Sequence, residues 1–334
     1  MDNRLFYLET HSQDPSFNLA FEEFVLQNRR TGTYLLLWQN QNSIIVGLNQ
    51  NTEAEINRPF VEAHGIRVVR RTTGGGAVYH DLGNLNYSFI TDAADAEHLE
   101  RKQFVRPIVE ALRGLGVAAE ASGRNDILAN GRKVSGTAQR LLNGRILHHG
   151  TLLFDSNPEQ IAGALRADPS KFQSKGISSV RSRVGNIRDF LDQDMDLPAF
   201  WAYLKRSLAG AGNLTEDSLT AEELAAVRRL QAEKYDTWAW NFGRSPAYNL
   251  TERRRWDGGT LEVRLQVEQG CIRDVVFYGD FLALRPNGAV VSALRGCPFR
   301  KEDVAAALRD LPMEEYFGGI RREEVCQTLL GEGV

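Results

Sequence analysis

The sequence has few cysteines and no long apolar segment. Its three cysteines, Cys271, Cys297 and Cys326, match no CxxC or metal-binding spacing. An odd number of scattered cysteines is typical of free thiols in a reducing cytoplasm. The longest early apolar run, residues 34–38, is far too short to span a bilayer. The first residues lack the basic and apolar regions of a signal peptide, so we expect a cytoplasmic protein that does not contact the membrane.

A strong charge of either sign is also absent. The formal net charge is −3 over 334 residues, which argues against general affinity for nucleic acid. The content of hydrophobic residues (42%) and of charged residues (25%) is that of an ordinary globular protein. The length suggests about two domains, and a local basic cluster could still bind a phosphorylated small molecule.

Capping and periodicity predict the first elements. Asp14 as N-cap and Pro15 at the first helical position begin a helix, with a phenylalanine stripe from Phe17 and with Glu22 and Glu23 on the other side. The expected early strands cover residues 35–38, 43–47, 65–69 and 86–90.

Two Asn-Gly pairs then predict a meander of antiparallel strands. Asn130-Gly131 and Asn143-Gly144 separate strand-like runs at 126–128, 133–137 and 145–154, and Asn-Gly is the strongest short hairpin signal. Helices are expected near residues 159–165, 197–208 and 221–234.

A second block begins near Tyr248. It contains paired strands at 255–266 and 271–278 and helices near 301–311 and 322–330. We expect a boundary near Asn241–Pro246, with domains at 1–243 and 247–334. The mixed order of elements indicates an α+β fold with a large, mainly antiparallel sheet.

The segment Arg70–Asp81 contains Gly74, Gly75 and Gly76 between two expected strands. Glycine backbone can approach a ligand closely and form an anion-binding nest, and Arg70 and Arg71 carry guanidinium groups suited to phosphate or carboxylate. The P-loop spacing is absent. The alternative is a plain turn with two solvated arginines.

Lys133 and Asp126 are the second candidate pair. A lysine beside small residues in a strand can place a point charge on a phosphate, or it can protect an edge strand against aggregation. Asp126 can hold Mg²⁺ together with phosphate oxygens, or it can cap a turn.

Two further segments leave alternatives open. His148 and His149 are adjacent in a strand, so only one of them can face a given pocket. The favoured alternative is a histidine that packs in the core or makes a structural hydrogen bond. The polar stretch Lys175–Arg183 could close over an anion or be a solvated loop.

Together these motifs resemble the lipoate-protein ligase family, in its bacterial long form with an accessory carboxy-terminal domain. The similar segments are Asp14–Glu23, Arg70–Asp81, Gly83–Asn86, Gly123–Asp126, Arg132–Gly136, His148–Leu153, Ser179–Val184 and Tyr235–Gly243. The resemblance implies a biotin-ligase-like α+β catalytic domain and a smaller α+β accessory domain. It implies that ATP adenylates lipoate with Mg²⁺ present, and that a lysine of an acceptor protein then takes the lipoyl group.

The resemblance also implies a role for particular residues. Lys133 is the catalytic residue and touches both the α-phosphate and the lipoate carboxyl. The other expected contacts are Arg71, Gly76, Ala77, Val78 and Tyr79 with ATP; Arg70, Gly74, Gly75 and His149 with lipoate; Lys175, Ser179, Val180, Arg181 and Arg183 in a loop over the adenylate; and Asp126 with Mg²⁺. The implied partners are lipoyl domains of 2-oxoacid dehydrogenase acyltransferase subunits and the glycine-cleavage H protein, and we expect a monomer.

Three rival functions differ in the residues that they require. A lipoyl or octanoyl transferase of the same fold needs a cysteine nucleophile in the catalytic domain, but every cysteine lies beyond residue 270. A relative that moves lipoyl groups between proteins is compatible with the motifs. A non-catalytic lipoyl-binding protein is disfavoured by the intact Lys133 and both arginines.

Overall fold

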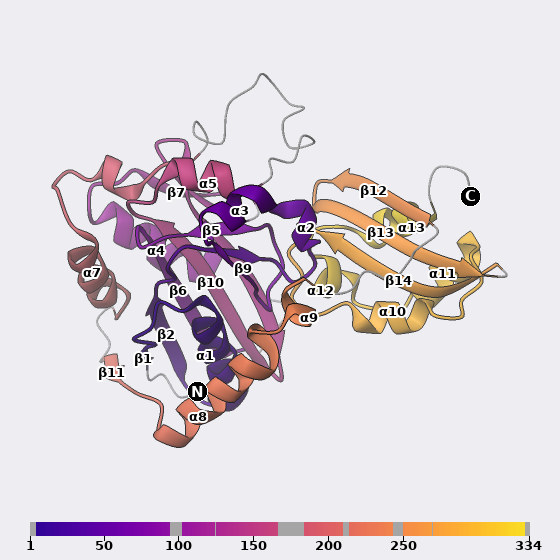
Figure 1. Cartoon of the computed structure of the whole chain (residues 1–334), viewed down its shortest axis with the longest axis horizontal. Helices are drawn as coiled ribbons and strands as arrows, with labels where there is room; N and C mark the ends of the chain where they lie inside the picture. The colour runs from indigo at the N-terminus through magenta and orange to yellow at the C-terminus, as the bar shows by residue number, and fades with distance from the viewer. Residues whose placement is uncertain are drawn as a thin grey trace.

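An eight-stranded sheet forms the centre of the amino-terminal part (Figure 1). The computed structural model describes residues 5–93, 102–123, 125–165, 184–209, 214–242, 250–268 and 270–330. In spatial order the strands are β11 (Leu214–Glu216), β1 (Leu5–Glu9), β2 (Thr33–Trp38), β6 (Asn84–Asp92), β10 (Arg145–Leu153), β9 (Arg132–Leu142), β8 (Asp126–Ala129) and β7 (Ala119–Ser122). Among the described strand pairs of this sheet, only those that β1 makes with β2 and β11 are parallel. The expected α+β class with a mainly antiparallel sheet is confirmed.

The two Asn-Gly pairs form the expected hairpin turns. Asn130 and Gly131 have φ values of 49° and 78°, and Asn143 and Gly144 have 50° and 75°. Two successive residues with positive φ form the tight turn that matches the twist of the flanking strands. Strands β8, β9 and β10 therefore pair in antiparallel order, as predicted.

A second, three-stranded sheet lies beside helix α1 (Pro15–Asn28), and its strands are β4 (Arg67–Arg70), β3 (Ser43–Val46) and β5 (Val78–His80). The helix begins as predicted, because the Asp14 carboxylate accepts the backbone N–H groups of Ser16 and Phe17. The predicted polar side of the helix was wrong. Glu22 and Glu23 are only 2% and 3% exposed, because α1 is covered on nearly all sides.

Helices cover both faces of the large sheet. On one face α4 (Lys102–Arg113) and α7 (Leu197–Ala209) pack on a core that includes Leu35 and Leu37. On the other face α1, α8 (Ala221–Leu230) and the π-helical turn η4 (Gln231–Tyr235) share a core with Leu36. The shorter helices of this part are α2 (Thr52–Glu55), α3 (Arg58–Ala63), α5 (Pro158–Ala164), η3 (Ile187–Phe190) and α9 (Trp238–Asn241).

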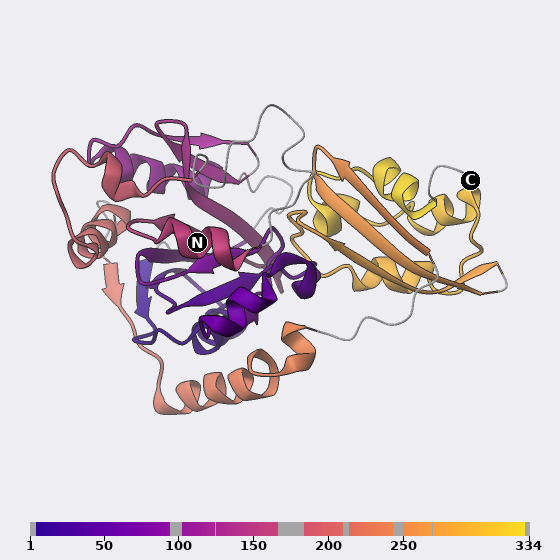
Figure 2. The same ribbon diagram turned by 45° about the horizontal axis from the view of Figure 1, so that its top comes forward.

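The carboxy-terminal residues build a separate core, and Figure 2 shows their strands and helices as a lobe beside the amino-terminal part. A sheet of β12 (Leu250–Trp256), β13 (Gly259–Glu268) and β14 (Cys271–Gly279) is covered by α10 (Gly288–Leu294), α11 (Lys301–Ala307), α12 (Met313–Phe317) and α13 (Arg322–Leu330). The prediction of one strand over 255–266 was wrong, because a turn at Asp257-Gly258 divides it into β12 and β13. The expected boundary stays a prediction, since residues 243–249 lie outside the described chain.

The end of β14 and the residues directly after it form hydrogen bonds with the amino-terminal part. The N–H of Gly75 donates to the Phe281 carbonyl at 3.0 Å, and the N–H of Gly279 donates to the Asn49 carbonyl at 2.7 Å. The small domain therefore rests directly on the glycine loop. Within the described ranges, no helix is both long and apolar enough to cross a membrane.

Candidate functional site

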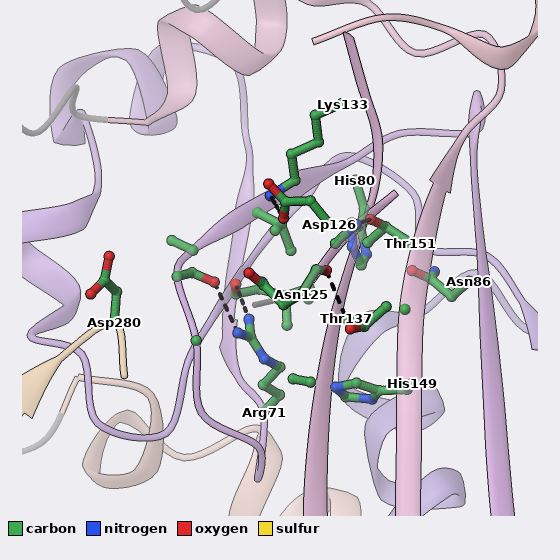
Figure 3. Close-up of a pocket in the computed structure, with 18 of the residues that line it drawn as sticks. Arg71, His80, Asn86, Asn125, Asp126, Lys133, Thr137, His149, Thr151 and Asp280 are labelled. Carbon is green, nitrogen blue, oxygen red and sulfur yellow. Dashed lines mark hydrogen bonds and ion pairs between the residues drawn. The ribbon is translucent and has the colours of Figure 1, made fainter. Parts of the chain in front are cut away.

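A cavity of about 270 Å³ lies between the glycine loop, β9 and β10. This volume is near the lower end of the range for small-molecule sites, about 300–1,000 Å³. Its walls include Leu19, Trp38, Ile45, Arg71, Gly75, Gly76, Ala77, Val78, His80, Asn86, Asp126, Lys133, His149, Thr151 and Asp280 (Figure 3). The cavity thus brings together residues from distant parts of the chain, and Asp280 comes from the small domain.

Arg71 organises the glycine loop from inside. Its guanidinium donates to the carbonyls of Ile45, Gly74 and Gly76 at 3.1, 2.6 and 2.9 Å, and its Nε donates to Thr73 Oγ1 at 2.9 Å. Burial lowers the pKa of Arg71 to about 10, so the group stays charged at neutral pH. The fork expected to hold an anion therefore holds the loop itself.

The three glycines have different surroundings. A Cβ on Gly74 would lie 2.6 Å from the Phe281 carbonyl oxygen, and Gly75 has a left-handed φ of 91°. A Cβ on Gly76 would meet nothing within 4 Å. Only Gly76 therefore borders open space on its side-chain face, whereas the bare Cα of Gly74 accommodates the small domain. Gly74 does not line the cavity.

Arg70 does not line the cavity that Lys133 and His149 share. Its guanidinium donates to carbonyl oxygens of Gly47, Leu48, Gln50, Trp240 and Asn241 and to the Thr52 hydroxyl. Arg70 lines a neighbouring cavity against the small domain instead. The dense set of acceptors explains this placement, because a buried guanidinium must satisfy its donors. Its contact with lipoate stays a prediction.

Lys133 and Asp126 face each other across β8 and β9 (Figure 3). The Lys133 Nζ lies 2.7 Å from Asp126 Oδ1, and the two side chains are 36% and 33% exposed. A Cβ on Gly136 would lie 3.2 Å from the Lys133 Nζ, so Gly136 leaves room for the ammonium group. The pair is accessible, and Lys133 can exchange its carboxylate partner for an anionic ligand.

His149 connects two buried groups. Its Nδ1 lies 2.9 Å from Glu22 Oε1, and its Nε2 lies 2.8 Å from Thr73 Oγ1. Thr73 Oγ1 in turn accepts from Arg71 Nε, so a chain of polar contacts runs from Arg71 to Glu22. Of the two adjacent histidines, only His149 lines the cavity, as expected. His148 stacks on Phe104 in the core, with ring centroids 5.0 Å apart.

Strand alternation separates the residues of β5. Val78 and His80 point into the cavity together with Ala77 from the preceding loop. Tyr79 points to the other face, packs with Ile44, and donates from its hydroxyl to Asn42 Oδ1 at 2.9 Å. Its side chain therefore does not line the cavity, and its contact with the nucleotide stays a prediction.

Some predicted residues cannot be placed and others were not predicted. Lys175, Ser179, Val180, Arg181 and Arg183 lie outside the described residues. Glu22, Thr73, His80 and Asp280 belong to the site, although the sequence patterns did not single them out. For the predicted Mg²⁺ site, no group of three His, Cys, Asp or Glu side chains is arranged around a common point in the described chain. Asp126 would be a single carboxylate ligand there.

Comparison with known proteins gives two matching families. Residues 14–209 match the lipoyl protein ligase A/B catalytic domain, and residues 245–329 match the bacterial lipoate protein ligase C-terminus. The chain is 44% identical to the lipoate-protein ligase LplJ of Bacillus subtilis over 97% of this chain and 99% of that protein. It is 41% identical to lipoate–protein ligase 1 of Staphylococcus aureus, over 95% and 97% of the two chains.

Solved structures show the same fold. P. falciparum LipL1 in complex with lipoate is 25% identical and has a TM-score of 0.78, over 92% of this chain and 94% of that chain. The bi-partite ligase of Thermoplasma acidophilum, described with its E2 lipoyl domain, has a TM-score of 0.62 at 30% identity, over 75% and 100% of the chains. A lipoate-protein ligase A bound with ATP has a TM-score of 0.62 at 29% identity, over 73% and 99%.

Proposed function

Because the chain belongs to the lipoate-protein ligase family, we propose that it adenylates lipoate with ATP and transfers the lipoyl group to an acceptor lysine. The observation that carries this proposal is the polarity of the cavity. Its lining combines the ammonium group of Lys133, whose side chain is 36% exposed, with the apolar side chains of Leu19, Trp38 and Ile45, each at most 3% exposed. A carboxylate on an apolar tail suits this arrangement. The solved relatives bound to lipoate and to ATP support it.

In the first step, a carboxylate oxygen of lipoate attacks the α-phosphorus of ATP. The bond from that phosphorus to the bridging oxygen breaks, and pyrophosphate leaves with the electron pair. Both reactants are anions, so a cation held between them lowers the repulsion and stabilises the charge in transfer. Lys133 is the accessible cation of the cavity, and Asp126 holds its ammonium group in place before the ligands bind.

Asp126 is the residue that would hold Mg²⁺. Mg²⁺ commonly takes one or two protein carboxylates and completes its shell with water and phosphate oxygens. The accessible carboxylate of Asp126 fits this pattern when a nucleotide supplies the remaining oxygens. The ion would supply positive charge next to the phosphates, while Lys133 would be released from Asp126 toward the reacting groups.

In the second step, the uncharged amine of the acceptor lysine attacks the acyl carbon of lipoyl-AMP. The bond from that carbon to the phosphate oxygen breaks, AMP leaves, and the amine loses a proton to solvent. We propose lipoyl domains of 2-oxoacid dehydrogenases and the glycine-cleavage H protein as acceptors of a monomeric, cytoplasmic enzyme. The relative described with its E2 lipoyl domain supports the first class.

A transferase that works through a cysteine thioester is not supported. All three cysteines are free thiols, and they lie in or beside the core of the small domain. None of them lines the cavity, so no thiol is in position to take an acyl group there.

The test is lipoate-dependent exchange of labelled pyrophosphate into ATP. We expect Lys133→Ala to lower the exchange rate about 10²–10³-fold, as removal of a transition-state contact does. Lys133→Arg should also fail, because a planar fork does not replace a compact ammonium group. Lys205→Ala is the matched control, since Lys205 also pairs with a carboxylate, Glu216 at 2.6 Å, but lies outside the cavity. Absence of exchange in the wild type, or normal exchange in Lys133→Ala, would contradict the proposal.

A further inference from the structure

Asn125 presents an accessible side-chain amide to the cavity. It directly precedes β8, it is partly exposed, and it lines the cavity wall (Figure 3). Its side-chain oxygen and nitrogen have no hydrogen-bond partner among the described residues, and neither atom is buried. The described part of the chain therefore leaves this amide available to a ligand.

The backbone of Asn125, by contrast, is held by the large sheet. Its carbonyl accepts the Thr137 N–H at 2.8 Å and the Thr137 hydroxyl at 3.2 Å. These bonds extend the pairing of β8 with β9 by one residue beyond the Asp126–Gly136 pair. The sheet therefore fixes where the side chain begins, and a substitution that changes only the side chain leaves both backbone bonds possible.

The same pairing places Asn125 next to the residues that hold the Lys133 ammonium group. The Lys133 Nζ lies beside Gly136, because a Cβ on Gly136 would be 3.2 Å from it, and it contacts Asp126 Oδ1 at 2.7 Å. Asp126 follows Asn125 in the chain, and all four residues line the cavity. An anion that replaces Asp126 on Lys133 therefore lies beside Asn125.

The chemistry of the amide determines what it offers to such an anion. A side-chain amide carries two N–H donors and one carbonyl acceptor. Because no described residue holds either end of the Asn125 amide, the nitrogen can turn toward a negatively charged ligand. A donor that is already in place stabilises charge that develops on an oxygen during a reaction.

We propose that the Asn125 side-chain amide donates a hydrogen bond to a non-bridging oxygen of the α-phosphate while lipoate attacks the phosphorus. This inference rests on the proposed function and adds a second donor, beside Lys133, to its first step. The charge on the non-bridging oxygens changes as the bond to lipoate forms and the bond to pyrophosphate breaks. A donor fixed beside them therefore stabilises the transition state more than it stabilises bound ATP. The amide keeps its own protons throughout.

The experiment measures lipoate-dependent pyrophosphate exchange with ATP and with the two diastereomers of ATPαS, in which sulfur replaces one or the other non-bridging α-oxygen. We expect Asn125→Ala to lower kcat with ATP about 10–100-fold and to change KM for ATP less than about twofold. Sulfur is a weak acceptor, so in one diastereomer it removes the same hydrogen bond as the substitution does. The ratio of the two diastereomer rates should therefore change about fivefold or more between the wild type and Asn125→Ala.

Two further variants complete the design. Asn125→Asp has nearly the same shape but puts a carboxylate beside the anion, so its kcat should fall below that of Asn125→Ala. Asn28→Ala is the matched control, because Asn28 is an exposed asparagine at the end of α1 that does not line the cavity. It should keep both the wild-type kcat and the wild-type ratio of the diastereomers.

The outcomes separate this inference from the proposed function. An unchanged kcat in Asn125→Ala overturns the role of Asn125, and so does an unchanged diastereomer ratio, because a merely structural residue affects both diastereomers alike. Recovery of the wild-type rate at high Mg²⁺ also overturns it, since the amide would then hold the ion through its oxygen. If Asn125→Ala does not fold, Asn125→Asp gives the same comparison of diastereomers. Absence of exchange with ATP in the wild type overturns the proposed function itself.

Discussion

Gly74 is the loop glycine whose replacement conflicts most directly with the small domain. A Cβ at this position would lie 2.6 Å from the Phe281 carbonyl oxygen and 2.8 Å from the Ala283 amide nitrogen. Both contacts are with backbone atoms, so no side-chain rotation can relieve them. We therefore expect Gly74→Ala to displace the segment 281–283 from the glycine loop.

The displacement removes hydrogen bonds that hold the small domain. The bond from the Gly75 N–H to Phe281 must break, and the bond from the Gly279 N–H to Asn49 is two residues away on the same segment. Each bond contributes about 0.5–1.5 kcal/mol net. Losing both costs about 1–3 kcal/mol, which changes the equilibrium between docked and undocked segment by about fivefold to more than a hundredfold.

Hydrogen–deuterium exchange of the peptide that covers residues 279–284 measures this equilibrium. Its exchange in Gly74→Ala should accelerate by the same factor, because protection depends on the population of the open form. Gly288→Ala is the control, since a Cβ at Gly288 meets nothing within 4 Å in the same domain. Unchanged protection in Gly74→Ala would refute the inference that the loop holds this segment.

The remaining predictions concern the two buried glutamates of α1. Glu22→Gln removes the carboxylate that faces His149 Nδ1, so we expect kcat/KM for lipoate adenylation to fall about tenfold to a hundredfold; an unchanged kcat/KM in a folded variant would contradict this. Burial opposes the charged form of Glu23, but Lys234, 2.6 Å away, prevails and lowers the pKa of Glu23. This stabilisation is present above the ordinary glutamate pKa and is lost as the pH falls through the lowered value. Lys234→Met should therefore lower the free energy of unfolding by about 2–4 kcal/mol at pH 7 and by less at pH 4. Urea denaturation at both pH values measures this, and a pH-independent difference would argue against the pair.

Local chemistry was sufficient to predict several elements. The N-cap at Asp14 depends on residues within one helical turn, and the hairpins at Asn130 and Asn143 depend on the φ values that Asn and Gly tolerate. The strand expected over 255–266 failed for a related reason. Asp257-Gly258 is itself a turn signal. The apolar alternation of Leu261, Val263 and Leu265 begins only after it, and residues 251–255 are polar, so no apolar pattern marked β12 as a strand of its own.

The hydrogen-bond partners of Arg70 and Arg71 could not be predicted from local chemistry. The carbonyls that satisfy Arg70 belong to residues about 20 positions before it and 170 positions after it, and no local pattern records such partners. Likewise the spacing of Glu22 and Glu23 places them on the side of α1 opposite the phenylalanine stripe. Their burial follows only from the elements that cover α1 on its remaining sides. Tertiary packing, not propensity, decides these cases.

The buried charges of the site also explain why Lys133 is the cation available to a ligand. Arg71 is joined through Thr73 and His149 to the Glu22 carboxylate, so one hydrogen-bonded chain has a positive and a negative end. Its charge is balanced inside the protein, and the Arg71 guanidinium also holds the loop carbonyls. Lys133 differs because its carboxylate partner is a third exposed, and the hydration of an exposed carboxylate makes that pair weak. An incoming carboxylate or phosphate can therefore displace Asp126 from Lys133 at small cost, whereas engaging Arg71 would require the glycine loop to open.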